Sequence, residues 1–543
     1  MTSHKNTRRN EDRPSVPLVT LPQPYCRRGN KTGNNCRRRA RVAGRAAAVT
    51  MPGMLPEAPV DSQAASATAG ASQPEPAAEI PSRLRFRGLL LLVAAAFFMQ
   101  SLDSTVVNTA VPMIADGLRV TPLEMRSALT SYVLTLAVLI PASPWLCDRL
   151  GTRRVFGLAI AVFGLGSLFC GLAQTLPELV AARVVQGIGG ASLLPVGRYV
   201  LVRTIAKREF VEAMSTVATY GLLGSVLGPL IGGALVQYTS WRLIFLINVP
   251  VAIAGYWMNR HEMPDYRLAH ANRFDLSGFL MFATASALLL IASELAGASP
   301  MPWSPIVLCA LGAAALGSIY VWHAGRVPFP VADLKLLRIR SVRVALSGGI
   351  FTRLGISGMF VLLMLFLQVG CGWSPLAAGL IMVPQAIGSI LAKRVINRAL
   401  VHYGYRRMLL GNTLIVAALL AMFAVLGPAS PAWLVGVLAF FYGGFAGLQY
   451  TAMNTLIYND LDIRHASMAS SLASTAQYLA MSFGIALGML LMQGLLQGHA
   501  RGQYVVAFRW TVILLALVTA AASRVFRLLP PDRPQAEAAA TAS

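Results

Sequence analysis

The chain has 543 residues, of which 55% are hydrophobic and 13% are charged, and its formal net charge is +24. A mean hydropathy of +0.59 is too high for a soluble protein of this length, so the sequence predicts a polytopic membrane protein. Neither nucleic-acid binding nor a metal site nor a cofactor is expected, because most arginines lie in loops and the six cysteines show no CxxC spacing.

Residues 1–87 precede the first apolar segment and form a basic stretch followed by a stretch rich in Ala and Pro. Such a composition cannot bury enough apolar surface to offset the entropy of ordering, so we expect disorder there and in residues 528–543. A polybasic arm that touches anionic lipid is an alternative function for the basic part. We also expect translation to begin at Met51 or Met54, which would leave the basic stretch outside the native protein.

Fourteen apolar segments follow, each of about the 20 residues that cross a bilayer as a helix. They lie near residues 89–111, 127–147, 155–173, 178–202, 211–236, 241–258, 275–295, 304–322, 344–369, 376–400, 408–427, 431–456, 466–496 and 505–526. The loops on one side carry four Lys or Arg residues, whereas those on the other side, with the C-terminal tail, carry 23. Because positive residues concentrate in cytoplasmic loops, we expect both termini in the cytoplasm and a multi-pass protein of the inner membrane.

The first apolar segment carries one carboxylate, Asp103, past its middle. An ionisable group at that depth costs about 2.5–3.5 kcal/mol on insertion scales and normally faces water or a partner. Arg183 in the fourth segment lies at a similar depth, so the two side chains are expected to pair or to exchange partners. The sequence therefore makes Asp103 the candidate proton site and Arg183 its modulator, with a structural acid as the alternative.

The loop after the second segment forms a compact charged turn of Asp148, Arg149, Gly151, Arg153 and Arg154. An aspartate there can interact with the N-terminus of a helix, while arginines hold carbonyls or lipid headgroups. We interpret this turn as a gating loop that breaks when the two halves of the protein move. An ordinary basic loop would explain the arginines but not the aspartate and the glycine.

The fifth segment is rich in glycine, and most of its glycines share one helix face. Such a face lets a neighbouring backbone approach closely, and a proline in the same segment bends the helix. The residues concerned are Gly221, Gly224, Gly228, Pro229, Gly232 and Gly233.

A short internal repeat suggests two equivalent halves. Gly151-Thr-Arg-Arg154 follows the second segment, and Gly404-Tyr-Arg-Arg407 follows the tenth. The predicted fold is therefore an all-α membrane protein with fourteen transmembrane helices, two six-helix pseudo-repeats and an inserted central helix pair. The expected parts are residues 88–260 and 344–527 for the two bundles, with residues 261–343 as the inserted pair and its linkers.

Polar residues in the spans are candidates for the lining of a substrate cavity between the halves, although each could simply bond a neighbouring helix. They are Asn108, Gln186, Gln385, Asn454 and Gln477. No lysine has the preceding glycine of a phosphate-binding GxxxxGK[ST] loop, so ATP is not the expected energy source by that route. A membrane-embedded enzyme is disfavoured because the histidines fall in loops or at span ends, and a passive scaffold would not explain Asp103 and Arg183.

Several of these stretches together resemble the major facilitator superfamily, and within it the fourteen-span drug:proton antiporters. The resemblance rests on Leu102-Asp-Ser-Thr-Val-Val-Asn-Thr-Ala-Val-Pro112, on Arg183-Val-Val-Gln-Gly-Ile-Gly-Gly190 and on the glycines of the fifth segment, and it covers about residues 88–527. It implies a proton-coupled multidrug exporter working by alternating access, with small amphipathic substrates, protons and lipid as partners and no enzymatic activity. Export of a normal metabolite, and the use of a periplasmic adaptor, stay open.

Overall fold

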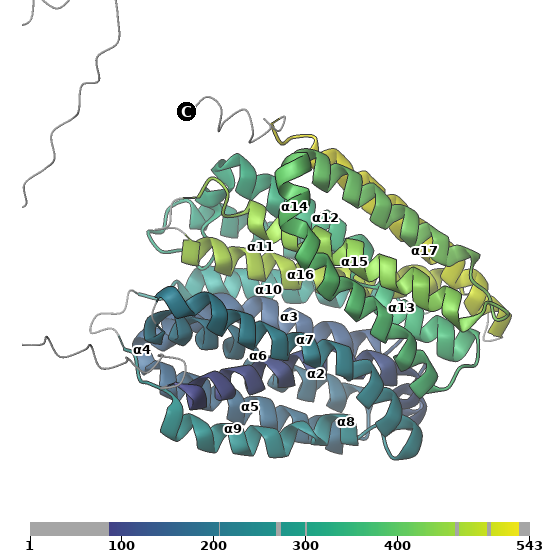
Figure 1. The fold of residues 1–543 in the computed structure, drawn as a ribbon, viewed down its shortest axis with the longest axis horizontal. Coiled ribbons are helices and arrows are strands. Elements are labelled where there is room, and N and C mark those ends of the chain that lie inside the picture. The colour runs from purple at the N-terminus through teal and green to yellow at the C-terminus, as the bar shows by residue number, and fades with distance from the viewer. Residues whose placement is uncertain are drawn as a thin grey trace, which may run out of the picture. The chain divides into compact units, whose positions relative to one another are not determined.

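The computed structural model describes residues 86–205, 207–267, 273–298, 301–461, 466–496 and 501–530. The chain divides into two compact units, Met1–Ala77 and Ala78–Ser543, and all described residues belong to the second. The proposed start at Met51 or Met54 and most of the two ends that were expected to be disordered fall outside the described residues. Residues 528–530 are described: Leu529 is buried, and the Leu528 carbonyl oxygen accepts a hydrogen bond from Nε of Arg340 at 2.6 Å. The described part contains helices and no strand, and it has fourteen helical spans long and apolar enough to cross a membrane, as the sequence predicted (Figure 1).

The first six spans contain eight α-helices, because the second and the sixth span are each interrupted. They are α2 (Arg87–Leu118), α3 (Arg126–Leu139), α4 (Ser143–Leu150), α5 (Thr152–Leu172), α6 (Leu176–Thr204), α7 (Lys207–Tyr238), α8 (Leu243–Leu246) and α9 (Asn248–Glu262). A single 3₁₀ turn, η1 (Ile140–Ala142), joins α3 to α4 around Pro141. Helices α2, α3, α5, α6, α7 and α9 pack on one another, and we call this group the first half.

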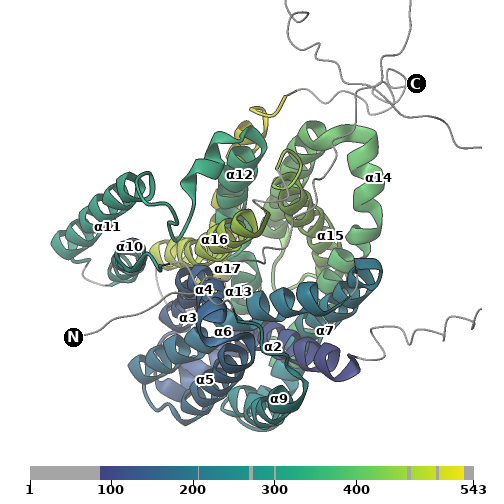
Figure 2. The same cartoon turned by 90° about the vertical axis from the view of Figure 1, so that its left-hand side faces the viewer.

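Two helices, α10 (Leu276–Leu295) and α11 (Trp303–Ala324), form a pair that follows the first half. They pack on each other, and α10 also contacts α3 and α16. Few of their side chains are buried, as expected for apolar helices that face lipid. Figure 2 shows the pair at the edge of the bundle, beside α12 and α16.

The last six spans form the second half. They are α12 (Arg340–Ile356) with α13 (Met359–Leu365) and the π-helix η3 (Phe366–Gly370), then α14 (Pro375–Met422), α15 (Ala432–Leu456), α16 (Ala466–Leu495) and α17 (Arg501–Phe526). Short 3₁₀ turns, η2 (Leu334–Arg338) and η4 (Phe423–Val425), precede α12 and follow α14. Helix α14 comprises two spans, Pro375–Ile396 and Arg398–Val425, and the helical backbone breaks near the start of the second at Gly404, where φ is 70°.

The repeated Gly-x-Arg-Arg loops share a backbone feature. Gly151 has a φ angle of 90° and Gly404 has a φ angle of 70°, values that residues other than glycine rarely adopt. Each glycine precedes the helical segment that carries its arginines. A common loop geometry at corresponding places in the two halves agrees with the expected pseudo-repeat.

The two halves share a hydrophobic core at one end of the bundle only. Near the end of α2 and the start of α3, residues of both halves belong to one buried cluster, which includes Ile114, Leu129, Leu362, Phe366, Phe423 and Phe508. At the other end, where α4 lies, the buried residues of each half form a separate cluster. We call these the closed end and the open end.

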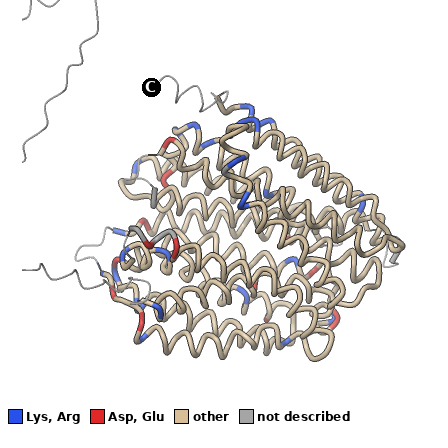
Figure 3. The backbone as a smooth tube through the Cα atoms, viewed as in Figure 1, with Lys and Arg blue, Asp and Glu red and all other residues tan. Residues whose placement is uncertain are grey.

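The charges follow the same division. Lys and Arg gather toward the edge of the bundle where α4 lies, and few lie at the opposite edge (Figure 3). The basic side of the loops in the sequence is therefore the open end of the structure.

Helix α7 joins the halves through its glycines. One face of α7 lies against the backbone and side chains of residues 98–106 of α2. At three positions on this face there is no room for a Cβ atom: Gly224, Gly228 and Gly232. Gly233 lies against Pro375 and Leu376 at the start of α14, and Pro229 lies against Gly379. Gly221 is less tightly packed, with Phe97 as its nearest neighbour. The glycine-rich face is thus the surface on which α2 rests, and Gly233 extends the contact to the other half.

Replacing Gly224 with Ala should destabilise the protein by about 1–3 kcal/mol, because the added Cβ would lie 2.6 Å from the Phe98 carbonyl oxygen, and a backbone cannot move cheaply. Gly411→Ala in α14 is the matched control, since nothing lies within 4 Å of its Cβ position. Thermal unfolding of both variants in one detergent measures the difference. Equal midpoints would contradict the close packing of α7 on α2.

Candidate functional site

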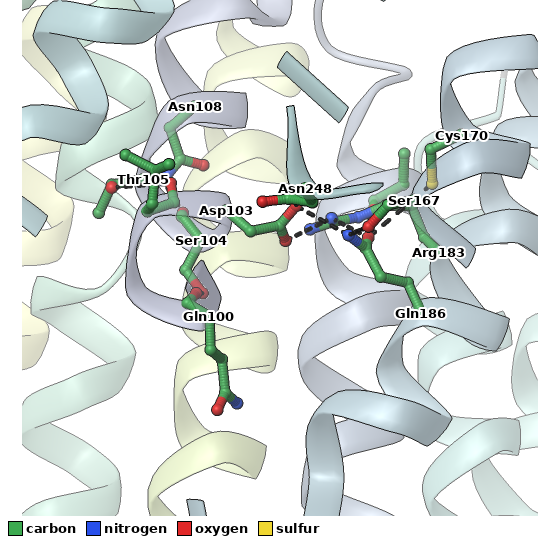
Figure 4. Close-up of polar contacts among 12 residues, drawn as sticks. Gln100, Asp103, Ser104, Thr105, Asn108, Ser167, Cys170, Arg183, Gln186 and Asn248 are labelled. Carbon is green, nitrogen blue, oxygen red and sulfur yellow. Dashed lines mark hydrogen bonds and ion pairs between the residues drawn. The ribbon is translucent and has the colours of Figure 1, made fainter. Parts of the chain in front are cut away.

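Asp103 lies in the interior of the first half and is almost fully buried. Its Oδ2 accepts a hydrogen bond from Nη1 of Arg183 at 2.8 Å, and the two side chains form an ion pair. Its Oδ1 accepts hydrogen bonds from Nε2 of Gln186 at 2.8 Å and from Nδ2 of Asn248 at 3.2 Å. Three helices therefore meet at one carboxylate: α2 supplies Asp103, α6 supplies Arg183 and Gln186, and α9 begins with Asn248 (Figure 4).

Arg183 is held on several sides. Its guanidinium lies 4.1 Å from the ring centre of Tyr132 and 5.8 Å from that of Phe245, and Nε donates to the carbonyl oxygen of Ala128 at 3.4 Å. Only 2% of its side chain is exposed. Stacking on aromatic faces and bonding to a carboxylate are the contacts that stabilise a buried guanidinium.

Gln186 links the charged pair to α5. Its Oε1 accepts from Nη1 of Arg183 at 2.6 Å, and its Nε2 donates to Asp103 and also to Oγ of Ser167 at 2.8 Å. The thiol of Cys170 donates to the same Oε1 at 3.8 Å. Because its amide is fully used and the residue is fully buried, Gln186 belongs to this network, and not to the lining of a cavity as the sequence suggested.

Both carboxylate oxygens of Asp103 are met by hydrogen-bond donors. One arginine N–H and two amide N–H groups donate to them, and the bond to the arginine is the charge-assisted one. Separating Arg183 from Asp103 would leave two opposite charges without partners in the interior of the first half.

The charged turn between α4 and α5 is fastened to the segment after α9. Nε of Arg153 donates to the Met263 carbonyl oxygen at 2.6 Å, and the backbone N–H of Arg153 donates to Oδ1 of Asp265 at 3.3 Å. Gly151 packs so closely on the Asp265 carboxylate that a Cβ atom would collide with it. These partners directly follow α9 of the first half. At the open end the turn is therefore bonded to its own half and not to the second half.

The other members of the predicted gating loop do not share these contacts. Asp148 accepts a hydrogen bond from the hydroxyl of Tyr199 at 3.4 Å, so its partner is a side chain of α6 and not a helix N-terminus. Arg149 lies 5.3 Å from the ring centre of Trp145. Arg154 is exposed.

Asp148 lines a cavity of about 630 Å³ at the open end, between α4, α6 and α16. Ser470, Ser471 and Ser474 of the second half form part of its wall. The two halves are thus separated here by open space.

A second cavity, of about 330 Å³, lies between the halves, and we call it the central cavity. Thr105 and Ser225 of the first half and Arg353, Gln385, Tyr450 and Gln477 of the second are among the residues that line it. The sequence suggested Gln385 and Gln477 for such a lining. Asn454 lines a smaller adjoining space with Arg353 and Gln477. Asn108 is buried and donates back to the Ser104 carbonyl oxygen at 3.0 Å, so its amide is directed along its own helix.

Polar contacts connect the halves at the closed end. Gln368 of η3 donates to the Thr109 carbonyl oxygen at 2.8 Å, and Ser482 of α16 donates to that of Thr130 at 3.1 Å. Nη1 of Arg126 donates to Oε1 of Gln493 at 3.1 Å, while its Nε and Nη2 bind the Glu294 carboxylate, both at 3.1 Å. Arg126 thus ties α3 to α16 and to the end of α10.

Several residues with these contacts were not predicted from the sequence, among them Asn248, Arg126, Glu294 and Gln493. Asn248 could have been found, because it is an isolated amide inside an apolar stretch, but the partners of Arg126 come from distant parts of the chain. Arg509 of α17 donates to the Leu426 carbonyl oxygen from Nε at 3.3 Å and from Nη2 at 3.2 Å, next to η4. Among the described residues, no group of three or more His, Cys, Asp or Glu side chains could hold a metal ion.

Two packed halves of membrane-spanning helices, a cavity between them and a buried ion pair in one half are the architecture of a secondary transporter. The chain belongs to the Major Facilitator Superfamily, whose family model matches residues 93–485.

Relatives and solved structures agree with this family. The chain is 42% identical over 455 residues to a Serratia proteamaculans protein called "Putative multidrug resistance protein MdtD", covering 82% of this chain and 93% of that one. A Cronobacter sakazakii protein of the same name is 41% identical over 465 residues, 84% and 96% of the respective chains. Among solved structures, the transporter PepTSo has a TM-score of 0.60 at 13% identity, covering 81% of this chain and 99% of that one. A D-xylose-proton symporter has a TM-score of 0.56 at 15% identity, with 82% and 98% covered.

Removing one member of the buried ion pair should cost more stability than removing both. Arg183→Met leaves the Asp103 carboxylate buried without a cation and should destabilise the protein by about 3–5 kcal/mol. Adding Asp103→Asn to the same chain should recover more than half of that loss, because no uncompensated charge then remains. A double-mutant cycle of thermal unfolding measures the coupling, and purely additive losses would contradict it.

Proposed function

We propose that this protein is a proton-coupled exporter of small molecules that works by alternating access in a bacterial inner membrane. The observation that carries the proposal is the ion pair of Asp103 and Arg183, which is buried among the membrane-spanning helices of a chain of this family. The multidrug resistance named for the relatives supports export of toxic compounds. The fold gives no support to an enzymatic activity.

The open end is proposed to face the cytoplasm. The charge bias of the loops supports this orientation, since Lys and Arg are retained on the cytoplasmic side. The structure then corresponds to a state in which a substrate could enter from the cytoplasm and in which the opposite side is sealed by the shared core.

Asp103 is proposed to carry the coupled proton. In the present conformation Arg183 and two amides donate to its carboxylate, and we assign this arrangement to the state after a proton has been released inward. Opening the other end would have to separate the pair before a new proton could bind. One proton moving inward supplies about 2.3 kcal/mol per 100 mV of membrane potential, which is sufficient to drive uphill export.

In proteoliposomes with an imposed pH gradient, addition of at least one of ethidium, chloramphenicol and 1-naphthaleneacetate should release protons. Asp103→Asn should reduce that response at least tenfold, because an amide cannot carry the proton, while leaving folded protein in the membrane. Asp116→Asn is the matched control, since Asp116 lies on the same helix but is exposed. Proton release that survives in the Asp103→Asn variant would exclude the assignment.

Thiol labelling should report the orientation. In a cysteine-free background, Ser474→Cys at the open-end cavity should react with an impermeant thiol reagent in inside-out vesicles. Ala429→Cys, in the exposed loop before α15 at the closed end, should react in right-side-out vesicles. The reverse pattern would overturn the proposed orientation.

A further inference from the structure

Among the described residues that line the central cavity, Arg353 is the one that carries a charge. It belongs to α12, and only 7% of its surface is exposed. None of the described wall residues is an aspartate or a glutamate. The charge on the cavity wall is therefore positive.

Arg353 is paired differently from Arg183. Its Nη2 donates to Oε1 of Gln477 at 3.2 Å, its Nη1 donates to the Gly349 carbonyl oxygen at 3.5 Å, and its guanidinium lies 4.9 Å from the ring centre of Tyr450. All three partners are neutral. Among the residues that the structure describes, no carboxylate lies within ion-pair distance of Arg353, whereas Arg183 has Asp103 at 2.8 Å.

A buried cation without a counter-ion is costly unless a ligand supplies the opposite charge. The guanidinium presents five N–H donors in a planar fork that matches a carboxylate, and the two hydrogen bonds in the structure use only part of that capacity. Gln477 fixes the fork from one side and Tyr450 supports it from another, so it is held in place before a ligand arrives.

The remaining walls suit an apolar body. Phe360, Met382, Tyr442 and Met481 line the same cavity, with Ser389 and Gln385 as polar neighbours. The volume of about 330 Å³ lies at the small end of the range for ligand pockets. An occupant would therefore combine one acidic group with a compact apolar part.

The approach from the open end carries further positive charge. Lys393 follows Ser389 by one turn on the same face of α14, and Arg198 lies exposed at the open-end cavity, 5.7 Å from the ring centre of Phe97. Arg203 also lines that cavity, and Asp148 is the acid that faces them there. In the lining of the open-end cavity two arginines thus face one acid, a balance that attracts anions to this end of the protein.

We propose that the central cavity binds an amphipathic organic anion, with the acidic group of the ligand on Arg353 and its apolar part against Phe360, Met382 and Met481. This assignment rests on the proposed function as an exporter and adds the chemical class of its substrate. Arg353 then neutralises the negative charge of the ligand, while Asp103 binds and releases the proton at a separate place in the first half.

Binding of three probes with the same naphthalene body tests the charge preference. 1-Naphthaleneacetate, 1-naphthaleneethanol and 1-naphthylethylammonium are titrated into purified protein in nanodiscs of neutral phosphatidylcholine at pH 7. The anion should bind at least tenfold more tightly than the alcohol, and the ammonium more weakly than both. An anion that binds no better than the alcohol would overturn the proposal, and so would a preference for the ammonium.

Variants locate the effect. Arg353→Gln should weaken binding of the anion at least tenfold and leave binding of the alcohol within twofold, whereas Arg353→Lys should retain part of the anion preference. Arg509→Gln, which removes an arginine outside the cavity, should change neither. An unchanged anion affinity in Arg353→Gln would refute the site. If Arg353→Gln does not fold, the wild-type preference and the Arg353→Lys variant decide the matter.

These measurements need no proton gradient. Preferential binding of the anion without coupled proton release would contradict the proposed exporter and leave the cavity assignment intact. Coupled release with ethidium alone, together with weak binding of the anion, would contradict the cavity assignment and leave the exporter intact.

Discussion

The structure of the first half depends on keeping one pair of opposite charges inside a bilayer. A lone carboxylate or guanidinium there would cost several kcal/mol, so each needs the other and needs its remaining lone pairs and protons satisfied. Gln186, Asn248 and Ser167 provide those bonds, and Tyr132 covers the face of the guanidinium. These contacts require α2, α5, α6 and the start of α9 to meet at one point. Polar contacts thus add to apolar burial in setting how these four helices pack.

The division into a closed and an open end separates two kinds of interface. At the closed end the halves share an apolar core and hydrogen bonds that include those from Gln368, Ser482 and Arg126. At the open end each half has its own core, and the charged turn of the first half bonds to its own chain. A rigid-body rotation of the halves would break the first set of contacts without disturbing the second. The halves can therefore move as units because their own loops hold them together.

The spans were predictable from the sequence because hydropathy and the placement of Lys and Arg are local signals, and all fourteen are present in the structure. The spacing of the glycines showed which face of α7 is made of small residues, so a close approach of a neighbouring helix was predictable. The contact of Gly233 with the start of α14 was not predictable from that spacing. The position of Gln186 was not predictable for a physical reason: a polar side chain in a span can face a neighbouring helix or a cavity, and helical period alone does not say which. The partners of Arg126 and the solitary charge of Arg353 depend on the tertiary arrangement, which no local pattern contains.

Helices α10 and α11 stand outside both halves, yet Arg126 connects them to each. The guanidinium makes its charged contacts to Glu294 and a single bond to Gln493, whose amide also reaches the Gly297 carbonyl oxygen. Because an ion pair is stronger than a bond to a neutral amide, separation of the halves should break first on the side of α16. Helices α10 and α11 would then move together with α3 of the first half. In each transport cycle they would lose their contact with α16, and lipid would take its place.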